Sequence, residues 1–150
     1  MREQLATSLT NALKAKDKRR TSTQRLVLAA IKDRDIAARS EDRTEGVGED
    51  EILSILQKMV KQRRESSQMY EEAGRLELAE QERDEIIIIE EYLPQQMNDD
   101  EIKAATIDVV KEIEAAGLKD MGRTMGALKE RYAGIMDFKK ASATVKELLG

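Results

Sequence analysis

EDEILSILQKMVKQRRESSQMYEEAGRLELAEQERDEIIIIEEYLP, residues 49–94, carries two segments of helix length that meet at Gly74. Apolar side chains in the first segment recur every three or four residues, at Ile52, Leu56, Met59 and Val60, which is the spacing of one helix face. Glycine readily adopts the left-handed conformation that ends a helix, so Gly74 is the predicted stop. The stretch therefore predicts two helices joined as a hairpin.

Four consecutive isoleucines, residues 86–89, leave two interpretations of the second segment. A buried β-strand would explain the run, but the flanking sequences QERDE and EEY are helix formers without turn signals. We therefore favour a helix that is apolar on all sides at the isoleucines and covered there by neighbouring elements. This helix is expected to end before Pro94, because proline cannot continue it.

The segments before the hairpin continue the helical pattern. Apolar positions predict two amphipathic helices, the first ending near Lys16 and the second capped by the hydroxyl residues 21–23. The segment RSEDRTEGVG, residues 39–48, is polar, contains two glycines and shows no periodicity. It is predicted to be an exposed loop.

Three helices are predicted after Pro94. Asn98 and Glu101 have the spacing of a capping box at the start of the first, and Gly117 is its expected end. Asp120 is the expected cap of the second helix, and the third carries the last apolar stripe.

Together these segments predict an all-α fold in two parts. Residues 1–94 are expected to form a four-helix N-terminal domain that contains the helical hairpin. Residues 95–150 are expected to form a three-helix, tail-like C-terminal bundle. A chain of 150 residues is long enough for one domain or for two very small ones.

The composition excludes several kinds of chemistry. The chain contains no cysteine and no histidine, which rules out disulfides, thiolate ligands and the commonest general base. Aromatic residues make up 3% of the sequence, too few for a base-stacking platform. The net charge of −4 argues against a protein that coats polyanions with its whole surface, but not against a local basic face.

No complete catalytic or metal site emerges from the residue pattern. Ser66 and Ser67 lie near Lys61, but serines among basic residues on a helix are usually solvated. The acidic residues 99–101 could ligate magnesium, yet carboxylates in the first turn of a helix already interact favourably with its dipole. The sequence therefore predicts no catalytic residue, no metal site and no cofactor.

Neither a membrane span nor a secretion signal is predicted. No apolar stretch approaches the roughly 20 residues that a membrane helix needs. The N-terminal residues MREQLATSLT lack the apolar core of a signal peptide. We therefore expect a cytoplasmic protein without a membrane partner.

Charge is distributed unevenly along the chain. Residues 14–34 hold eight basic side chains against two acidic ones, whereas residues 71–91 hold nine carboxylates against two arginines. A second basic cluster includes Lys58, Lys61 and Arg64. These cations could contact the phosphates of a nucleic acid.

A structural role for the same charges is the interpretation we favour. The basic first helix of the hairpin and its acidic second helix would pair with each other, which would consume part of the charge. Arg63 continues the apolar face of the first helix and needs a partner there. We expect that partner to be Glu82 or Glu85.

The C-terminal part carries a pair of glycines. Gly122 and Gly126 are four residues apart, so they share one helix face and leave a strip that another backbone can approach. Contact with another helix is the commoner use of such a strip, but the surrounding cations also allow contact with RNA phosphates. The candidate cations are Lys119, Arg123, Lys129, Lys139 and Lys140.

Several motifs closely resemble the YqeY family. KMVKQRRESSQMYEEAGRLELAEQE, EEYLPQQM and LKDMGRTMGALKERYAG are similar to its patterns K-x-V-K-Q-R-R-E-S, Y-x-x-A-G-R-x-x-L-A, Y-L-P-x-Q and K-D-M-G-x-x-M. The motifs occur in the family's order and span essentially the whole chain. The chain departs from the family at Gln24, where an aliphatic residue is common, and at Phe138, where glycine is common.

The resemblance implies a stand-alone relative of a larger protein. The family belongs with the GatB/YqeY group and looks like the helical and tail region of the B subunit of the glutamine-dependent tRNA amidotransferase. There, the tail region helps to recognise tRNA by its shape. The kinase and transamidase domain and the separate amidase subunit have no counterpart in this chain, so an association with carbon–nitrogen ligase activity would require partner subunits.

Three functions are consistent with these observations. The first is a non-catalytic module that binds tRNA or accompanies a tRNA amidotransferase, through phosphates and shape, and DNA is not expected as a partner. The second is a protein–protein adaptor in translation or metabolism. The third is an accessory to a carbon–nitrogen ligase that uses glutamine as amide donor. A loss of binding with rising salt would separate the first from the second.

Overall fold

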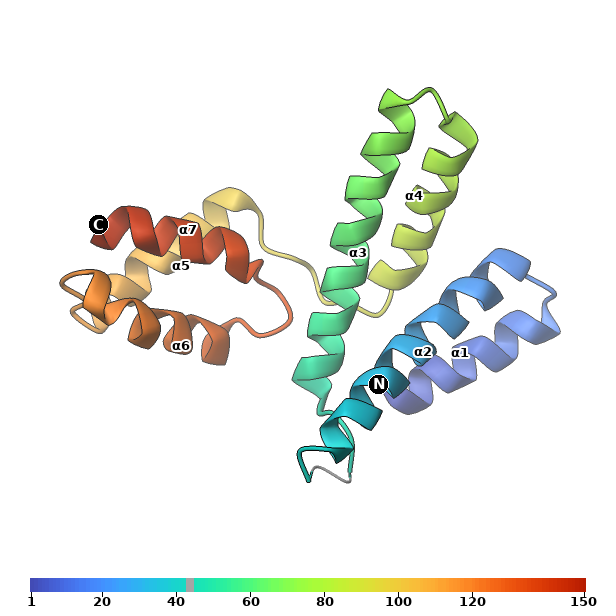
Figure 1. The fold of residues 1–150 in the computed structure, drawn as a ribbon, viewed down its shortest axis with the longest axis horizontal. Coiled ribbons are helices and arrows are strands. Elements are labelled where there is room, and N and C mark those ends of the chain that lie inside the picture. Colours follow the sequence, from blue (N-terminus) through green and yellow to red (C-terminus); the bar gives the residue numbers. More distant parts are fainter. Residues whose placement is uncertain (43–44) are drawn as a thin grey trace. The chain divides into compact units, whose positions relative to one another are not determined.

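The computed structural model describes residues 1–42 and 45–150, which form seven α-helices and no β-strand (Figure 1). The first four are α1 (Arg2–Lys14), α2 (Lys18–Arg39), α3 (Glu49–Glu72) and α4 (Leu76–Glu90). The last three are α5 (Asp99–Glu112), α6 (Met121–Arg131) and α7 (Phe138–Leu149), with a 3₁₀ turn, η1 (Leu118–Asp120), before α6. The predicted all-α fold, with four helices before Pro94 and three after it, is confirmed. None of the described helices is both long and apolar enough to span a membrane.

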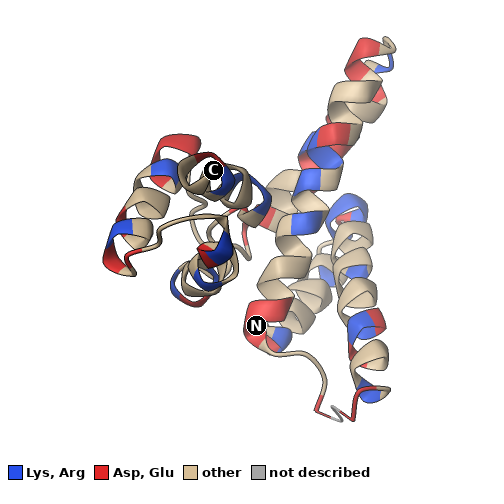
Figure 2. Cartoon of the chain, turned by 60° about the vertical axis from the view of Figure 1, so that its left-hand side comes forward, with Lys and Arg blue, Asp and Glu red and all other residues tan. Residues whose placement is uncertain are grey.

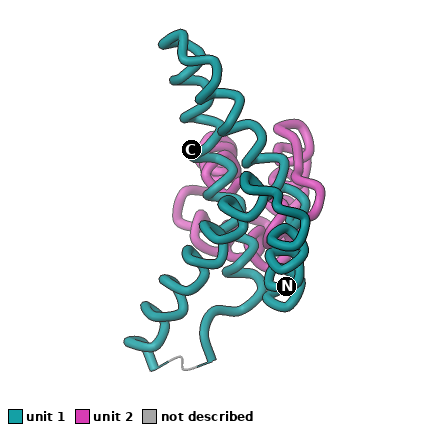
Figure 3. The backbone as a smooth tube through the Cα atoms, turned by 90° about the vertical axis from the view of Figure 1, so that its right-hand side faces the viewer, with its two compact units in different colours: residues 1–93 teal, residues 94–150 magenta. Residues whose placement is uncertain are grey.

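The chain divides into two compact units, Met1–Leu93 and Pro94–Gly150 (Figure 3). Each unit has a separate hydrophobic core. The largest buried side chains of the N-terminal core include Leu5, Leu56 and Ile89, and those of the C-terminal core include Leu128 and Met136.

The α3–α4 hairpin of the N-terminal unit contains a nearly buried ion pair. Arg63 Nε donates to Glu85 Oε2 at 3.0 Å, and the two side chains are 14% and 10% exposed. The expected pairing of Arg63 with Glu85 is thereby confirmed. Figure 2 shows acidic and basic segments distributed along this hairpin. Exposed pairs at Arg64–Glu90, 2.6 Å, and Arg83–Glu71, 2.9 Å, also join the two helices.

Polar contacts also fasten α2 to α4. Arg20 donates to both carboxylate oxygens of Glu91, at 2.6 and 2.9 Å, and this pairing lowers the pKa of Glu91 from its ordinary value. Gln24 is fully buried, and its Nε2 donates to Tyr92 Oη at 2.7 Å. An aliphatic residue is common at this position in the family that the sequence resembles. The start of α2 is therefore packed against the end of α4 through a hydrogen bond as well as apolar contacts.

A third polar contact closes the N-terminal unit at Asp35. Arg2 donates to both Asp35 oxygens, at 2.7 and 2.8 Å, and the Val47 backbone N–H donates to Asp35 Oδ1 at 2.9 Å. Arg2 also donates to the Val47 carbonyl at 2.9 Å. The side-chain hydrogen bonds of Arg2 and the Val47 N–H hold the pKa of Asp35 at about 2, below its ordinary 3.8. Residues 2, 35 and 47 are thus held together although they are distant in sequence.

The expected cap of α2 is wrong by one helical turn. Asp17 is the cap, because its carboxylate accepts from the Arg20 N–H at 3.1 Å. The hydroxyl residues 21–23 consequently lie inside the helix, where Thr21 and Thr23 are buried. The expected loop of residues 39–48 is found between α2 and α3, except that Arg43 and Thr44 lie outside the described residues.

The isoleucine run is helical, as predicted, but it is not covered on all sides. Ile86, Ile88 and Ile89 are buried, whereas Ile87 is 61% exposed. In the N-terminal unit α2 and α3 are the helices packed against α4, and two neighbours leave one side of a helix open.

The expected end of α5 at Gly117 is also wrong. The helix stops at Glu112, and Glu114 takes the left-handed conformation, with φ of 55°. The Ala115 N–H then donates to the Val110 carbonyl, so a free carbonyl of the last helical turn has its hydrogen bond two residues before Gly117. The capping box of Asn98 and Glu101 at the start of α5 is confirmed.

The Arg63–Glu85 pair predicts an asymmetric response to mutation. Glu85→Gln should lower the free energy of unfolding by about 3 kcal/mol, because it removes the hydrogen-bonded carboxylate from a guanidinium that is only 14% exposed. Glu71→Gln, which breaks the exposed pair with Arg83, should cost less than about 0.5 kcal/mol. Urea denaturation followed by circular dichroism measures both, and equal losses would contradict the structural role of Arg63.

The Asp35 contacts predict a component of stability that acid removes. Because the folded pKa is depressed, this stabilisation is complete above the unfolded pKa near 3.8 and is lost as the pH falls toward 2. Asp35→Asn should therefore be less stable than the unmodified protein at pH 6, and the difference should narrow between pH 4 and pH 2. Urea denaturation across this pH range measures it, and a constant difference would count against the proposed linkage.

Candidate nucleic-acid interface

Helix α6 has one buried face and one exposed face. Thr124 and Leu128 are buried in the C-terminal core, with Met121 and Met125 packed against it. Gly122, Arg123 and Gly126 lie on the opposite side of a 3.6-residue period and point away from the core, whereas Ala127 packs against it. Gly122, Arg123, Gly126 and Lys129 lie on the exposed face, where the carboxylate-bearing Glu130 is exposed as well. We call these four residues, together with Lys119 of η1, the α6 face.

The two glycines of the α6 face are open to solvent. A Cβ atom built on Gly122 or Gly126 would meet no atom within 4 Å among the described residues. The glycine strip is therefore not used for contact between helices within the described part of the chain, which was the commoner expectation. It leaves the backbone without a side chain at two surface positions about one turn apart.

Asp120 lies at the N-terminal end of the α6 face. The expected side-chain cap of α6 is wrong, because the Asp120 carboxylate turns back and accepts from the Ala116 N–H at 2.9 Å. This bond, with the positive charges of Arg123 and Lys119, lowers the pKa of Asp120 from its ordinary value. Arg123 Nη2 lies 3.4 Å from Asp120 Oδ1, and the Arg123 side chain is 56% exposed, so its guanidinium also faces solvent.

The other two tail cations are not on the α6 face. Helices α6 and α7 lie side by side and run in opposite directions (Figure 1), so Lys139 and Lys140 lie at the end of the bundle where α6 finishes. Lys140 Nζ pairs with Asp99 Oδ1 of α5 at 2.9 Å, and Lys139 is exposed beside it. Lys119 and Arg123 thus lie at the start of α6 beside Gly122, whereas Lys129 is in the last turn of α6, at the end of the bundle where α7 begins with Lys139 and Lys140.

The second predicted cluster lies on α3. Lys58 and Arg64 are exposed and Lys61 is half-buried. Arg64 is paired with Glu90 of α4 at 2.6 Å, which supports the interpretation that the hairpin consumes part of its own charge.

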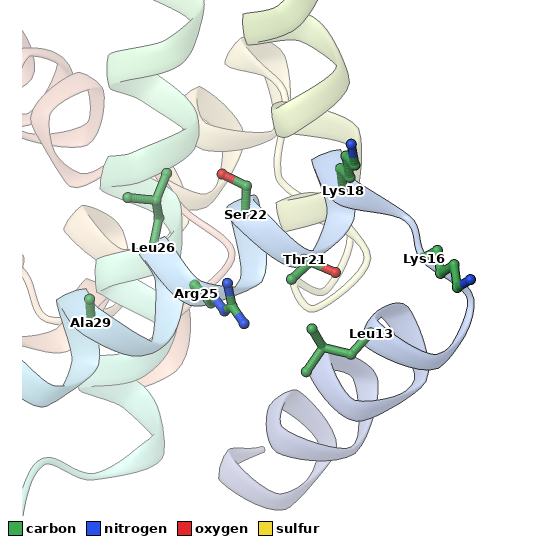
Figure 4. Close-up of a pocket in the computed structure, with 8 residues that line it drawn as sticks. All are labelled: Leu13, Lys16, Lys18, Thr21, Ser22, Arg25, Leu26 and Ala29. Atoms are coloured by element: carbon green, nitrogen blue, oxygen red, sulfur yellow. The ribbon is translucent and has the colours of Figure 1, made fainter.

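A basic groove between α1 and α2 was not among the sites predicted from sequence. The sequence signal for it was the excess of basic over acidic side chains within residues 14–34. This α1–α2 groove, of about 750 Å³, is lined by both helices and their turn (Figure 4). Leu13 points from α1 toward Thr21 and Arg25 of α2. The full lining is Leu13, Lys16, Lys18, Thr21, Ser22, Arg25, Leu26 and Ala29.

The residues weighed for catalysis have structural roles. The Ser67 hydroxyl is buried and donates to the Arg64 carbonyl at 2.9 Å, and residues 99–101 form the first turn of α5. Among the described residues no group of three or more Asp and Glu side chains is placed to hold a metal ion.

Comparison with known families gives one result for the whole chain. Residues 2–149 match the family model YqeY, described as Yqey-like protein. A comparison with curated proteins gives no match.

The open glycine strip predicts a gain in stability on substitution. Gly122→Ala and Gly126→Ala should each raise the free energy of unfolding by about 0.5–1 kcal/mol, because alanine favours the helix and its Cβ meets no neighbour. Gly46→Ala is the contrasting variant, since Gly46 has φ of 83° and an added Cβ would lie 2.5 Å from Asp35 Oδ1. Urea denaturation measures all three, and a loss at Gly122 or Gly126 would show that the strip is covered.

Proposed function

We propose that this chain, which belongs to the YqeY family, is a non-catalytic module that binds tRNA through its phosphates and its shape. The observation that carries the proposal is the α6 face. It presents helix backbone without side chains at Gly122 and Gly126, flanked by three exposed cations and by one exposed carboxylate, Glu130.

The chemistry of the α6 face suits a ribose–phosphate backbone. Glycines without side chains allow the nucleic-acid backbone to approach the helix closely. Lys119, Arg123 and Lys129 each supply a positive charge for a phosphate, and phosphate contacts position a protein without reading sequence. With 3% aromatic residues, the chain has few side chains on which splayed bases could stack. Recognition by backbone and shape is therefore the mode of binding proposed here.

The resemblance to the amidotransferase B subunit supports tRNA as the ligand. In that subunit the corresponding tail helps to recognise tRNA, and an accessory role beside an amidotransferase follows from the same resemblance. The chain would hold or present tRNA, and any chemistry would take place on partner subunits.

Binding to bulk tRNA at two salt concentrations tests the proposal. With three phosphate contacts, a tenfold rise in salt should weaken binding roughly a hundredfold. Lys119→Glu with Arg123→Glu should reduce affinity at least tenfold while the unfolding transition is retained, because both side chains are exposed. Duplex DNA should bind more weakly than tRNA, since its shape differs.

A matched control keeps the test specific to the α6 face. Lys103→Glu with Lys111→Glu makes the same charge change on exposed positions of α5 in the same unit. This pair should leave tRNA affinity within about twofold, because neither side chain belongs to the α6 face and exposed surface charges are screened by salt. Equal effects of the two double variants, or no binding at low salt, would overturn the proposal.

A further inference from the structure

The α1–α2 groove combines unpaired cations with exposed leucines. Within the described ranges, Lys16, Lys18 and Arg25 form no ion pair, and no carboxylate lines the groove. Leu13 and Leu26 are 48% and 46% exposed. The carboxylate of Asp17 accepts from the Arg20 N–H as the cap of α2 and pairs with the Arg20 side chain. The groove therefore presents positive charge beside apolar surface.

The turn of the α3–α4 hairpin, residues 69–80, has the opposite net charge, with four glutamates against the single cation Arg75. Met69 and Leu76 are 69% and 63% exposed, and Leu78 is also exposed. Glu77 and Glu80 are exposed and form no ion pair in the part of the chain that is described. We call this segment the hairpin turn.

We propose that the α1–α2 groove of one copy of this chain binds the hairpin turn of a second copy. Lys18 and Arg25 would face Glu77 and Glu80, and the exposed leucines of the two surfaces would cover each other. Both surfaces belong to the unit Met1–Leu93, and both are exposed there, so one chain does not cover its own groove with its own turn.

The mixed character of the groove favours a protein occupant over RNA. Phosphates would satisfy Lys18 and Arg25 but would leave Leu13 and Leu26 in contact with water, whereas an acidic surface that carries leucines satisfies both. The hairpin turn is an acidic surface of this kind within the same sequence.

Analytical ultracentrifugation from micromolar to several hundred micromolar protein tests the proposal. The 17.0 kDa chain should self-associate, and the association should weaken when salt is raised. Lys18→Glu with Arg25→Glu, or Glu77→Lys with Glu80→Lys, should each weaken it at least tenfold, because like charges then face each other. The control Lys32→Glu with Arg34→Glu, on exposed positions of α2 outside the groove, should leave it unchanged.

Mixing the two double variants gives the decisive measurement. In the mixture the acidic groove of one variant meets the basic turn of the other, and the remaining groove and turn make the unmodified contact. Association should therefore return to the unmodified level, provided that each variant alone retains its unfolding transition. A monomer at every concentration, or no recovery on mixing, would overturn the proposal. A groove variant that loses tRNA affinity without altering self-association would instead assign the groove to RNA.

Discussion

The nearly buried pair of Arg63 and Glu85 is the contact on which the N-terminal unit depends. It joins α3 to α4, and neither charge can leave its partner without an uncompensated burial cost. A one-residue shift of either helix would separate the two groups, so the pair fixes the register of the hairpin. Helix α4 is then positioned to receive Arg20 and Gln24 of α2, through Glu91 and Tyr92.

Internal pairing also determines which charges are left for partners. The arginines at positions 2, 19, 20, 63, 64 and 83 are held by carboxylates of the same unit. Among the described residues Arg123 of the α6 face has one ion pair, with Asp120, the cations of the α1–α2 groove have none, and the two sets differ in what surrounds them. Bare backbone accompanies the first and leucines accompany the second, which is why we assign RNA to one and protein to the other.

Local sequence was a good guide wherever one segment determines its own structure. The capping box at Asn98 depends on two side chains three residues apart, and Gly74 supplies the left-handed residue after α3. Helix ends were predicted less well where several residues could serve. At its start, α2 is capped by Asp17, which precedes the hydroxyl residues in the sequence. At its end, α5 is stopped by the left-handed Glu114, which precedes Gly117. In both cases the helix boundary is set where its free backbone groups are satisfied.

The sequence by itself determined the all-α class, the hairpin, the pairing of Arg63 with a carboxylate of α4 and the glycine strip, because helical periodicity and charge order are local properties. Only the tertiary structure decided that Ile87 is exposed, that Lys140 pairs with Asp99, and that Lys18 and Arg25 line a groove with Leu13. These outcomes depend on which helix lies beside which, and that is set by contacts between residues distant in sequence, which no single segment records.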